Sequence, residues 1–384
     1  MSNVVDLRNK YNANAKKYND LKDKYTKEKD EQMNAKLRPL AQDSLGFLME
    51  LKDYYQSQMS ENDENKKKYA DDLQTTEKLI DVWLDRLTKL GSSISGIPNT
   101  TFDDIAGLED VKQTAKNYLF ALKNPKIAEK YNISTNVGIL LYGPPGTGKT
   151  LVAKAIAHEL GVRFFVITPS MIFGSYVGES ERNVREIFTE LRACKNGAVL
   201  LVDECESIFA RREGNSSRAE IGVANQLLQE MNGATDSEGG DKRVIIGATN
   251  RPWLMDEAYL RYKRFSLHFY IDMPNRDAIK TVVRLNLKKL PCDAQLEEMI
   301  TSFFQNREGE YTCADISGII EQCAYLAMQE YQRKVEQGYS FKKDEVVNIN
   351  TSHFNQVMKT FSKSVKREDL RAYEEFRDSR NQVK

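Results

Sequence analysis

Cysteine and histidine are scarce in this chain, and neither is spaced as a metal site. The 384 residues contain five cysteines and three histidines, and no two cysteines follow a CxxC spacing. A structural zinc site needs about four such ligands close together, so the sequence offers no candidate for one. The odd number of scattered cysteines favours free thiols in a reducing compartment.

Long apolar segments and an excess of basic charge are also missing. The first twenty residues lack the apolar core of a secretory signal, and no window approaches the ~18 apolar residues of a membrane span. We therefore expect a cytoplasmic protein with no transmembrane segment. Lysine plus arginine and aspartate plus glutamate both number 56, so the formal net charge is +0. Nucleic-acid binders usually carry a basic excess, and we expect no nucleic-acid partner.

The first 90 residues nearly lack glycine and show apolar residues at helical spacing. Gly46 is the only glycine in this part, and the intervals of three and four residues predict amphipathic helices. Pro39 is expected to interrupt the first helix. Residues 1–90 are predicted to form an all-α helical bundle or a coiled-coil hairpin, and residues 91–101 a linker. The apolar stripes contain Leu7, Tyr11, Tyr18, Leu45, Leu48, Leu73, Ile80 and Trp83.

From residue 137 onward, short apolar runs alternate with helical patterns. Runs such as VGILLY (137–142), AVLLV (198–202) and VIIGAT (244–249) are typical of buried strands, and helical segments lie between the runs. Alternating strands and helices predict a parallel sheet with helices on both faces. After Pro274 the spacing is helical only, which predicts a separate, smaller helical domain.

The segment GPPGTGKT (143–150) lies between the first predicted strand and the helix after it, and it fits the phosphate-binding pattern G-x-x-x-x-G-K-[ST]. Its glycines allow backbone N–H groups to curl around phosphates at a helix N-terminus. Lys149 can reach the β- and γ-phosphates of ATP, and the Thr150 hydroxyl can ligate Mg²⁺. The predicted nucleotide contacts in and beside this segment are Pro145, Gly146, Thr147, Gly148, Lys149, Thr150 and Leu151.

Polar residues that suit phosphoryl transfer follow two other predicted strands. Asp203 would hold Mg²⁺ through water, and Glu204 would polarise the attacking water. Asn250 would orient that water or sense the γ-phosphate, because the carboxyl ends of parallel strands meet at one ligand-binding edge. Farther along, Arg261 and Arg264 could stabilise transition-state charge across a subunit boundary.

Taken together, these motifs resemble the AAA subfamily of the AAA+ ATPases, which includes valosin-containing protein, katanin and spastin. The similarity begins at FDDIAGLEDVK (102–112), and SVKREDLRAYEEF (364–376) is similar to the closing helix of the family. The resemblance implies a large α/β domain with a five-stranded parallel sheet in residues 102–273. It also implies a small helical lid domain with the C-terminal helix in residues 274–384, and Mg²⁺-dependent hydrolysis of ATP.

Only the resemblance indicates which residues contact the adenine base of the nucleotide. The residues that it places around the adenine are Asp104, Ile105, Ala106, Asn286, Cys313 and Ala314. The family usually carries a Gly-Ala pair where this chain has Cys313 and Ala314, so a side chain is added beside the nucleotide. A histidine is often found where Asn286 stands. Neither departure removes a catalytic group, and we expect an active enzyme.

A ring and a central pore are further implications of the resemblance. The family forms rings that are usually hexameric, so we expect a homo-hexamer in which Arg261 and Arg264 reach the neighbour's nucleotide. The segment SYVGESE (175–181) matches the first pore loop. Tyr176 and Val177 would then project into the channel and grip a translocating polypeptide, and a second pore loop would fall within residues 211–220.

The expected function is ATP-driven remodelling of a polypeptide threaded through the pore. The N-terminal helices would choose the target or an adaptor protein. An alternative is a nucleotide-switched assembly factor that binds partners without translocating them, and Tyr176 discriminates between the two. The neutral charge and the aromatic pore loop disfavour a nucleic-acid motor.

Overall fold

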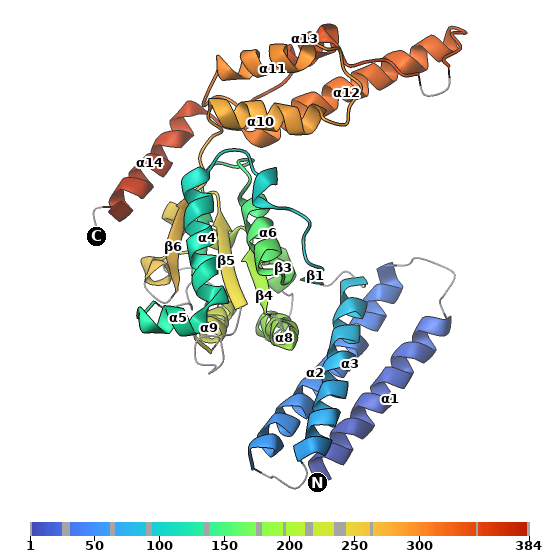
Figure 1. Cartoon of the computed structure of the whole chain (residues 1–384), viewed down its shortest axis with the longest axis vertical. Coiled ribbons are helices and arrows are strands. Elements are labelled where there is room, and N and C mark those ends of the chain that lie inside the picture. The colour runs from blue at the N-terminus through green and yellow to red at the C-terminus, as the bar shows by residue number, and fades with distance from the viewer. Residues whose placement is uncertain are drawn as a thin grey trace.

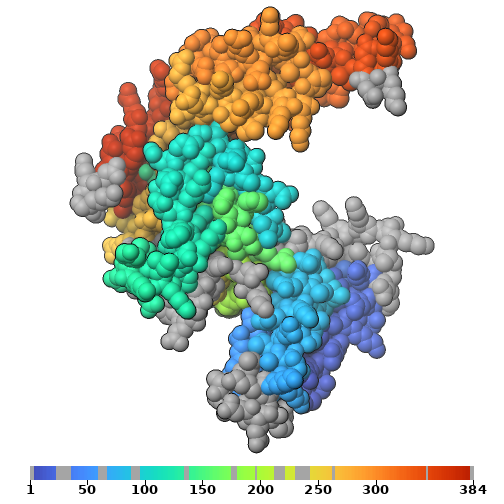
Figure 2. Space-filling model, viewed as in Figure 1, coloured from blue at the N-terminus to red at the C-terminus, as the bar shows by residue number. Residues whose placement is uncertain are grey.

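The computed structural model describes residues 2–24, 31–61, 66–89, 94–133, 138–173, 179–194, 197–211, 218–233, 243–261, 264–342 and 345–381. Along the chain, long helices come first, an α/β domain follows, and a second group of helices comes last (Figure 1). The space-filling view places the N-terminal helices and the second helical group at opposite ends of the α/β domain (Figure 2). No helix in these described ranges is both long enough and apolar enough to cross a bilayer.

The described residues of the N-terminal part form a bundle of three helices, which lie side by side (Figure 1). They are α1 (Ser2–Lys24), α2 (Glu31–Glu61) and α3 (Lys66–Lys89). The apolar stripes predicted from the sequence meet in one core, where Tyr18 packs edge-on against Trp83 with ring centroids 4.9 Å apart. Of the two predicted forms, the structure has the bundle.

The expectation that Pro39 interrupts a helix was wrong. Helix α2 runs through Pro39 without a break. Leu37 and Ala41, which flank the proline, are both buried in the bundle core. A proline inside a helix costs about 3 kcal/mol, but helices in proteins are stabilised mainly by packing of their apolar face. Burial of that face on both sides of Pro39 therefore outweighs the lost backbone hydrogen bond.

The predicted five-stranded parallel sheet is confirmed. Its strands are β2 (Gly138–Tyr142), β3 (Arg163–Ile167), β4 (Ala198–Val202), β5 (Arg243–Thr249) and β6 (Phe265–Tyr270), in the order β3-β4-β5-β2-β6. Inside the predicted linker, β1 (Ile94–Ser95) adds a short antiparallel strand against β3. Two residues are too few to show a strand pattern in the sequence.

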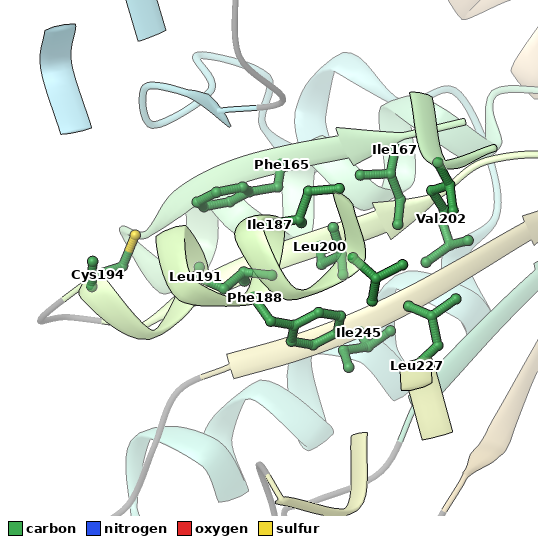
Figure 3. Close-up of a cluster of buried hydrophobic side chains, with 14 of the residues drawn as sticks. Phe165, Ile167, Ile187, Phe188, Leu191, Cys194, Leu200, Val202, Leu227 and Ile245 are labelled. Atoms are coloured by element: carbon green, nitrogen blue, oxygen red, sulfur yellow. The ribbon is translucent and has the colours of Figure 1, made fainter. Parts of the chain in front are cut away.

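Helices cover both faces of the sheet. Helices α4 (Glu109–Lys123) and α6 (Lys149–Leu160) share one apolar core with the sheet, and α5 (Pro125–Lys130) follows α4. The other face is covered by α7 (Pro169–Ile172), α8 (Glu179–Ala193) and α9 (Arg218–Gly233). Figure 3 shows how strand residues on this second face pack against α8 and α9: Phe165, Ile167, Leu200, Val202 and Ile245 against Ile187, Phe188, Leu191 and Leu227.

The second helical group has a core of its own. It is formed by α10 (Arg276–Leu287), α11 (Leu296–Gln305), α12 (Cys313–Glu336) and α13 (Thr351–Met358). The last helix, α14 (Arg367–Asn381), leaves this group and packs on the α/β domain, where Phe376 meets Tyr142 with ring centroids 5.2 Å apart. The C-terminal helix is therefore a neighbour of strand β2.

The N-terminal bundle rests on helix α8. The amide Nε2 of Gln42 on α2 donates a 2.9 Å hydrogen bond to Oε1 of Glu190, which is almost fully buried. Burial raises the pKa of Glu190 to about 7. A second contact joins the bundle to strand β3, where Arg163 forms a 2.7 Å ion pair with Asp85 of α3. The bundle core is continuous with the core beneath α8.

Candidate nucleotide-binding site

The phosphate loop connects β2 to α6, and its backbone curvature depends on glycine. Gly146 has a φ of +75°, and a Cβ added there would lie 2.8 Å from both Ala314 Cβ and Thr312 Oγ1. At Gly143, an added Cβ would lie 2.2 Å from the carbonyl oxygen of Ile271. The loop ends at Lys149, the first residue of α6, so its curled backbone meets the positive end of a helix. This geometry suits an anion.

Lys149 closes the loop on itself. Its Nζ donates hydrogen bonds to the carbonyl oxygens of Gly143, at 2.9 Å, and Pro144, at 2.7 Å. Burial lowers the pKa of Lys149 to about 8, although the charges of Asp203 and Glu206 act in the opposite direction. The amine therefore lies within the phosphate loop, where a bound phosphate would be its anionic partner.

The affinity for ATP is expected to fall as the pH rises above about 8. A bound phosphate raises the pKa of Lys149, so binding above pH 8 requires uptake of a proton and weakens by up to about tenfold per pH unit. Anisotropy of a fluorescent ATP analogue between pH 7 and 10 measures this dependence. Calorimetry at pH 8.5 in two buffers of different ionisation enthalpy detects the proton that the protein takes up when ATP binds. A constant Kd up to pH 10 would contradict the prediction.

Two carboxylates follow strand β4. Asp203 Oδ1 accepts a hydrogen bond from the backbone N–H of Glu204 at 3.0 Å. Glu204 adopts a left-handed backbone conformation with φ 50° and ψ 41°. Residues other than glycine rarely adopt it, and such strain clusters at functional sites. The conformation leaves Glu204 exposed on the wall of a cleft of about 640 Å³.

Asn250 lies on the same cleft, immediately after strand β5. Its Oδ1 is buried without a hydrogen-bond partner among the described residues, and so is Oε2 of Glu206. Buried polar atoms without a partner are rare in folded proteins and need an explanation. Both residues line the cleft, so a polar ligand or an ordered water held beside them would satisfy these atoms. Pro145 of the phosphate loop lines the same cleft, so the cleft adjoins the loop.

The second helical group contacts the phosphate loop through the start of α12. The backbone N–H of Ala314 donates to the carbonyl oxygen of Gly146 at 3.0 Å. Thr312 and Asp315 cap this helix reciprocally, which fixes the position of its first turn. The predicted residues Cys313 and Ala314 therefore lie at the phosphate loop. Burial raises the pKa of Cys313 to about 11, so its thiol is neutral.

Comparison with known proteins identifies the family. The model of the family described as "ATPase family associated with various cellular activities (AAA)" matches residues 139–273. This range contains the phosphate loop, both carboxylates and Asn250. The chain belongs to the AAA ATPases.

Two curated relatives extend the similarity beyond that domain. The cell division control protein 48 homolog C of Arabidopsis thaliana is 31% identical over 296 residues, which is 75% of this chain and 34% of the relative. The cell division cycle protein 48 homolog of Archaeoglobus fulgidus is 35% identical over 286 residues, which is 72% of this chain and 37% of the relative. The chain thus spans roughly a third of the length of these relatives.

In this AAA ATPase, the segment predicted to contact adenine bridges the two cores. Ile105 is buried in the core of the α/β domain, and Ala106 packs against the core of the lid formed by α10 to α13. Asp104 accepts a 2.8 Å hydrogen bond from the backbone N–H of Thr101, and this bond lowers the pKa of the carboxyl. Asn286 instead donates to the carbonyl oxygen of Val282 on its own helix, at 2.8 Å.

The two arginines predicted to act across a subunit boundary, Arg261 and Arg264, have different surroundings. Arg264 donates to the carbonyl oxygen of Ala258 at 2.6 Å, and its guanidinium lies 5.9 Å from the ring centre of Tyr259. Arg261 is exposed at the end of a short 3₁₀ helix, Glu257–Leu260. Arg261 is therefore the more accessible of the two to a neighbouring subunit.

The predicted pore residues Tyr176 and Val177 lie outside the described residues, as do residues 212–217 of the second pore segment. The described chain resumes at Glu179, within the first of these segments, where helix α8 begins. Their assignment stays a prediction.

Sequence reasoning missed two residues on the cleft of this AAA ATPase. Glu206, with its unpartnered oxygen, follows the two predicted carboxylates closely, and its position could have suggested a third acid. Tyr373 comes from α14 and donates to the carbonyl oxygen of Asn250 at 2.6 Å. Because 123 residues separate this pair, no local pattern could have found it.

Proposed function

We propose that this AAA ATPase is a ring-forming motor that hydrolyses ATP to remodel polypeptides. The observation that carries the proposal is the cleft beside the phosphate loop, where Glu204 is exposed and Oδ1 of Asn250 has no partner among the described residues. Phosphoryl transfer asks a protein mainly for positioning and for charge stabilisation. The cleft offers groups for both.

Each group has a defined part in hydrolysis. Lys149 exchanges its two carbonyl partners for phosphate oxygens when ATP binds. The carboxylate of Glu204 accepts a hydrogen bond from the attacking water, and the Asn250 side chain fixes the direction of attack. Thr150 and Asp203 would hold Mg²⁺, which neutralises phosphate charge when bound. Arg261 of a neighbouring subunit would stabilise the charge that develops on the γ-phosphate.

The remodelling part of the proposal rests on the similarity to cell division cycle protein 48 homologs and on the pore-loop match. A homo-hexamer would place Tyr176 and Val177 of each subunit around one channel. The N-terminal bundle would select the polypeptide or its adaptor. All five cysteines are free thiols, which fits the cytoplasmic location that we also propose.

Replacement of Tyr176 by alanine is expected to weaken polypeptide binding without slowing ATP hydrolysis. Removal of one aromatic contact corresponds to about 1.5–3 kcal/mol, so the Kd should rise by about tenfold or more. Fluorescence anisotropy of labelled, unstructured casein with ATP measures binding, in the hydrolysis-deficient Glu204→Gln background. Phosphate release, measured with Glu204 intact, should stay within about twofold.

Tyr131→Ala is the matched control for this experiment. Tyr131 is 75% exposed at the end of α5, so its replacement removes a surface tyrosine from a site outside the proposed pore. Casein binding should be unaffected in this variant. Equal affinities for parent and Tyr176→Ala would contradict threading through the pore.

A nucleotide-switched assembly factor is the second candidate. The contact that favours it is the hydrogen bond between Gln42 of the bundle and Glu190 of α8, because α8 begins next to the proposed pore loop. Through this contact the bundle could change its exposed surface with the nucleotide state. Casein binding that does not depend on Tyr176, together with an active ATPase, would support this candidate.

A further inference from the structure

The segment that begins at Ser364 and continues into helix α14 lies along the nucleotide cleft, beside Asn250. Ser364, Val365, Glu368, Asp369, Ala372 and Tyr373 all line that cleft. We propose that Tyr373 is a positioning residue for ATP hydrolysis: its hydroxyl holds the backbone of Asn250 so that the asparagine side chain faces the reacting phosphate. The inference rests on the proposed function, since it assumes that Asn250 acts on the attacking water.

One hydrogen bond holds the backbone of Asn250 itself, and a second one joins its two neighbours in the chain. Tyr373 is buried, and its hydroxyl donates to the carbonyl oxygen of Asn250 at 2.6 Å. Across Asn250, Oγ1 of the buried Thr249 accepts a hydrogen bond from the N–H of Arg251 at 2.9 Å. The backbone is therefore fixed, while Oδ1 of the side chain keeps its hydrogen-bonding capacity for a ligand.

The ring of Tyr373 packs against two other aromatic rings. Trp253 packs edge-on against it with centroids 5.1 Å apart, and Tyr270 stacks on it at 6.2 Å. Burial, together with the negative charges of Asp369 and Glu206, raises the pKa of Tyr373 to about 12. The phenol thus stays protonated and remains a donor throughout the neutral pH range.

The same segment is anchored to the lid at its other end. Ser364 donates from its hydroxyl to the carboxylate of Asp315, which caps α12. The first turn of α12 in turn contacts the phosphate loop through Ala314 and Gly146. Residues 364–373 therefore connect the lid to Asn250, and a change in lid position on nucleotide binding would reach Asn250 through Tyr373.

Tyr373→Phe tests the proposal because it removes only the hydroxyl. We expect kcat for ATP hydrolysis to fall about tenfold, since a small displacement of a positioning group slows chemistry strongly. The Kd for ADP, which has no γ-phosphate, should stay within about twofold, and so should the mass of the assembled protein in light scattering. Tyr270→Phe is the matched control: it removes a hydroxyl from the same aromatic cluster, but that hydroxyl donates to Asp272 at 3.0 Å.

A double-mutant cycle with Asn250→Ala separates positioning from simple stabilisation. If Tyr373 acts through Asn250, adding Tyr373→Phe to Asn250→Ala should lower kcat no further. An additive loss, or equal losses from Tyr373→Phe and Tyr270→Phe, would overturn the proposal. If Tyr373→Phe keeps full activity while Asn250→Ala hydrolyses ATP slowly, this proposal is overturned and the proposed function stays intact. Full activity of Asn250→Ala would overturn both this proposal and the role assigned to Asn250.

Discussion

Glu204→Gln is expected to lower kcat for ATP hydrolysis by about 10²–10⁴-fold, the usual contribution of a general base, while ATP still binds. The amide keeps the shape of the side chain but accepts the proton of the attacking water poorly. Glu204 lies outside the phosphate loop and is held by an unusual backbone conformation, so the substitution leaves the phosphate contacts in place. Phosphate release and anisotropy of a fluorescent ATP analogue measure the two effects separately.

Glu206→Gln is the control for this prediction. Glu206 lies two residues along the chain and on the same cleft, and one of its oxygens lacks a partner among the described residues. We expect this variant to keep kcat within about tenfold of the parent, because its carboxylate has no assigned part in activating water. A larger loss for Glu206→Gln than for Glu204→Gln would reassign the base.

The mass of Glu204→Gln with ATP also tests ring formation. Because hydrolysis is blocked, ATP should hold the subunits together, and light scattering should report a mass near six subunits. The parent without nucleotide should be smaller. A monomer under both conditions would contradict the ring and favour the nucleotide-switched assembly factor.

The α/β architecture could be predicted because its strands are short apolar runs between helical patterns. Runs of this kind are buried on both faces of a parallel sheet, as Leu140 and Leu141 of β2 are. The path of α2 through Pro39 could not be predicted. It depends on burial of Leu37 and Ala41 against other helices, and local propensity says nothing of such packing.

Some parts of the candidate site could likewise be predicted from the sequence, and others could not. The phosphate loop, the two carboxylates and Asn250 follow from local motifs, and the carboxyl ends of parallel strands bring the last three to one edge. Tyr373 reaches Asn250 only through the path of α14 across the α/β domain. The different surroundings of Arg261 and Arg264 are likewise a property of the fold, because one guanidinium bonds to Ala258 and the other is exposed.

The exposure of Arg261 leads to the second prediction with a large expected effect on kcat. Arg261→Ala is expected to lower kcat by about 10³–10⁵-fold, the range for an arginine that stabilises the charge of a transferring phosphoryl group. Nucleotide binding by the same subunit should be unchanged, because its own phosphate loop and carboxylates are intact. Arg264→Ala should have a different signature: since Arg264 bonds to Ala258 within its own chain, we expect a lower melting temperature together with any loss of activity.

Mixing two inactive variants decides whether Arg261 acts across a subunit boundary. A subunit with Arg261→Ala keeps Glu204, and a subunit with Glu204→Gln keeps Arg261. In a mixed ring, each Arg261→Ala site that faces a Glu204→Gln neighbour has both groups and should hydrolyse ATP, so activity should rise well above that of either variant alone. If Arg261 served its own subunit, no site in the mixture would hold both groups. The mixture would then stay inactive, and the role in a neighbouring site would have to be abandoned.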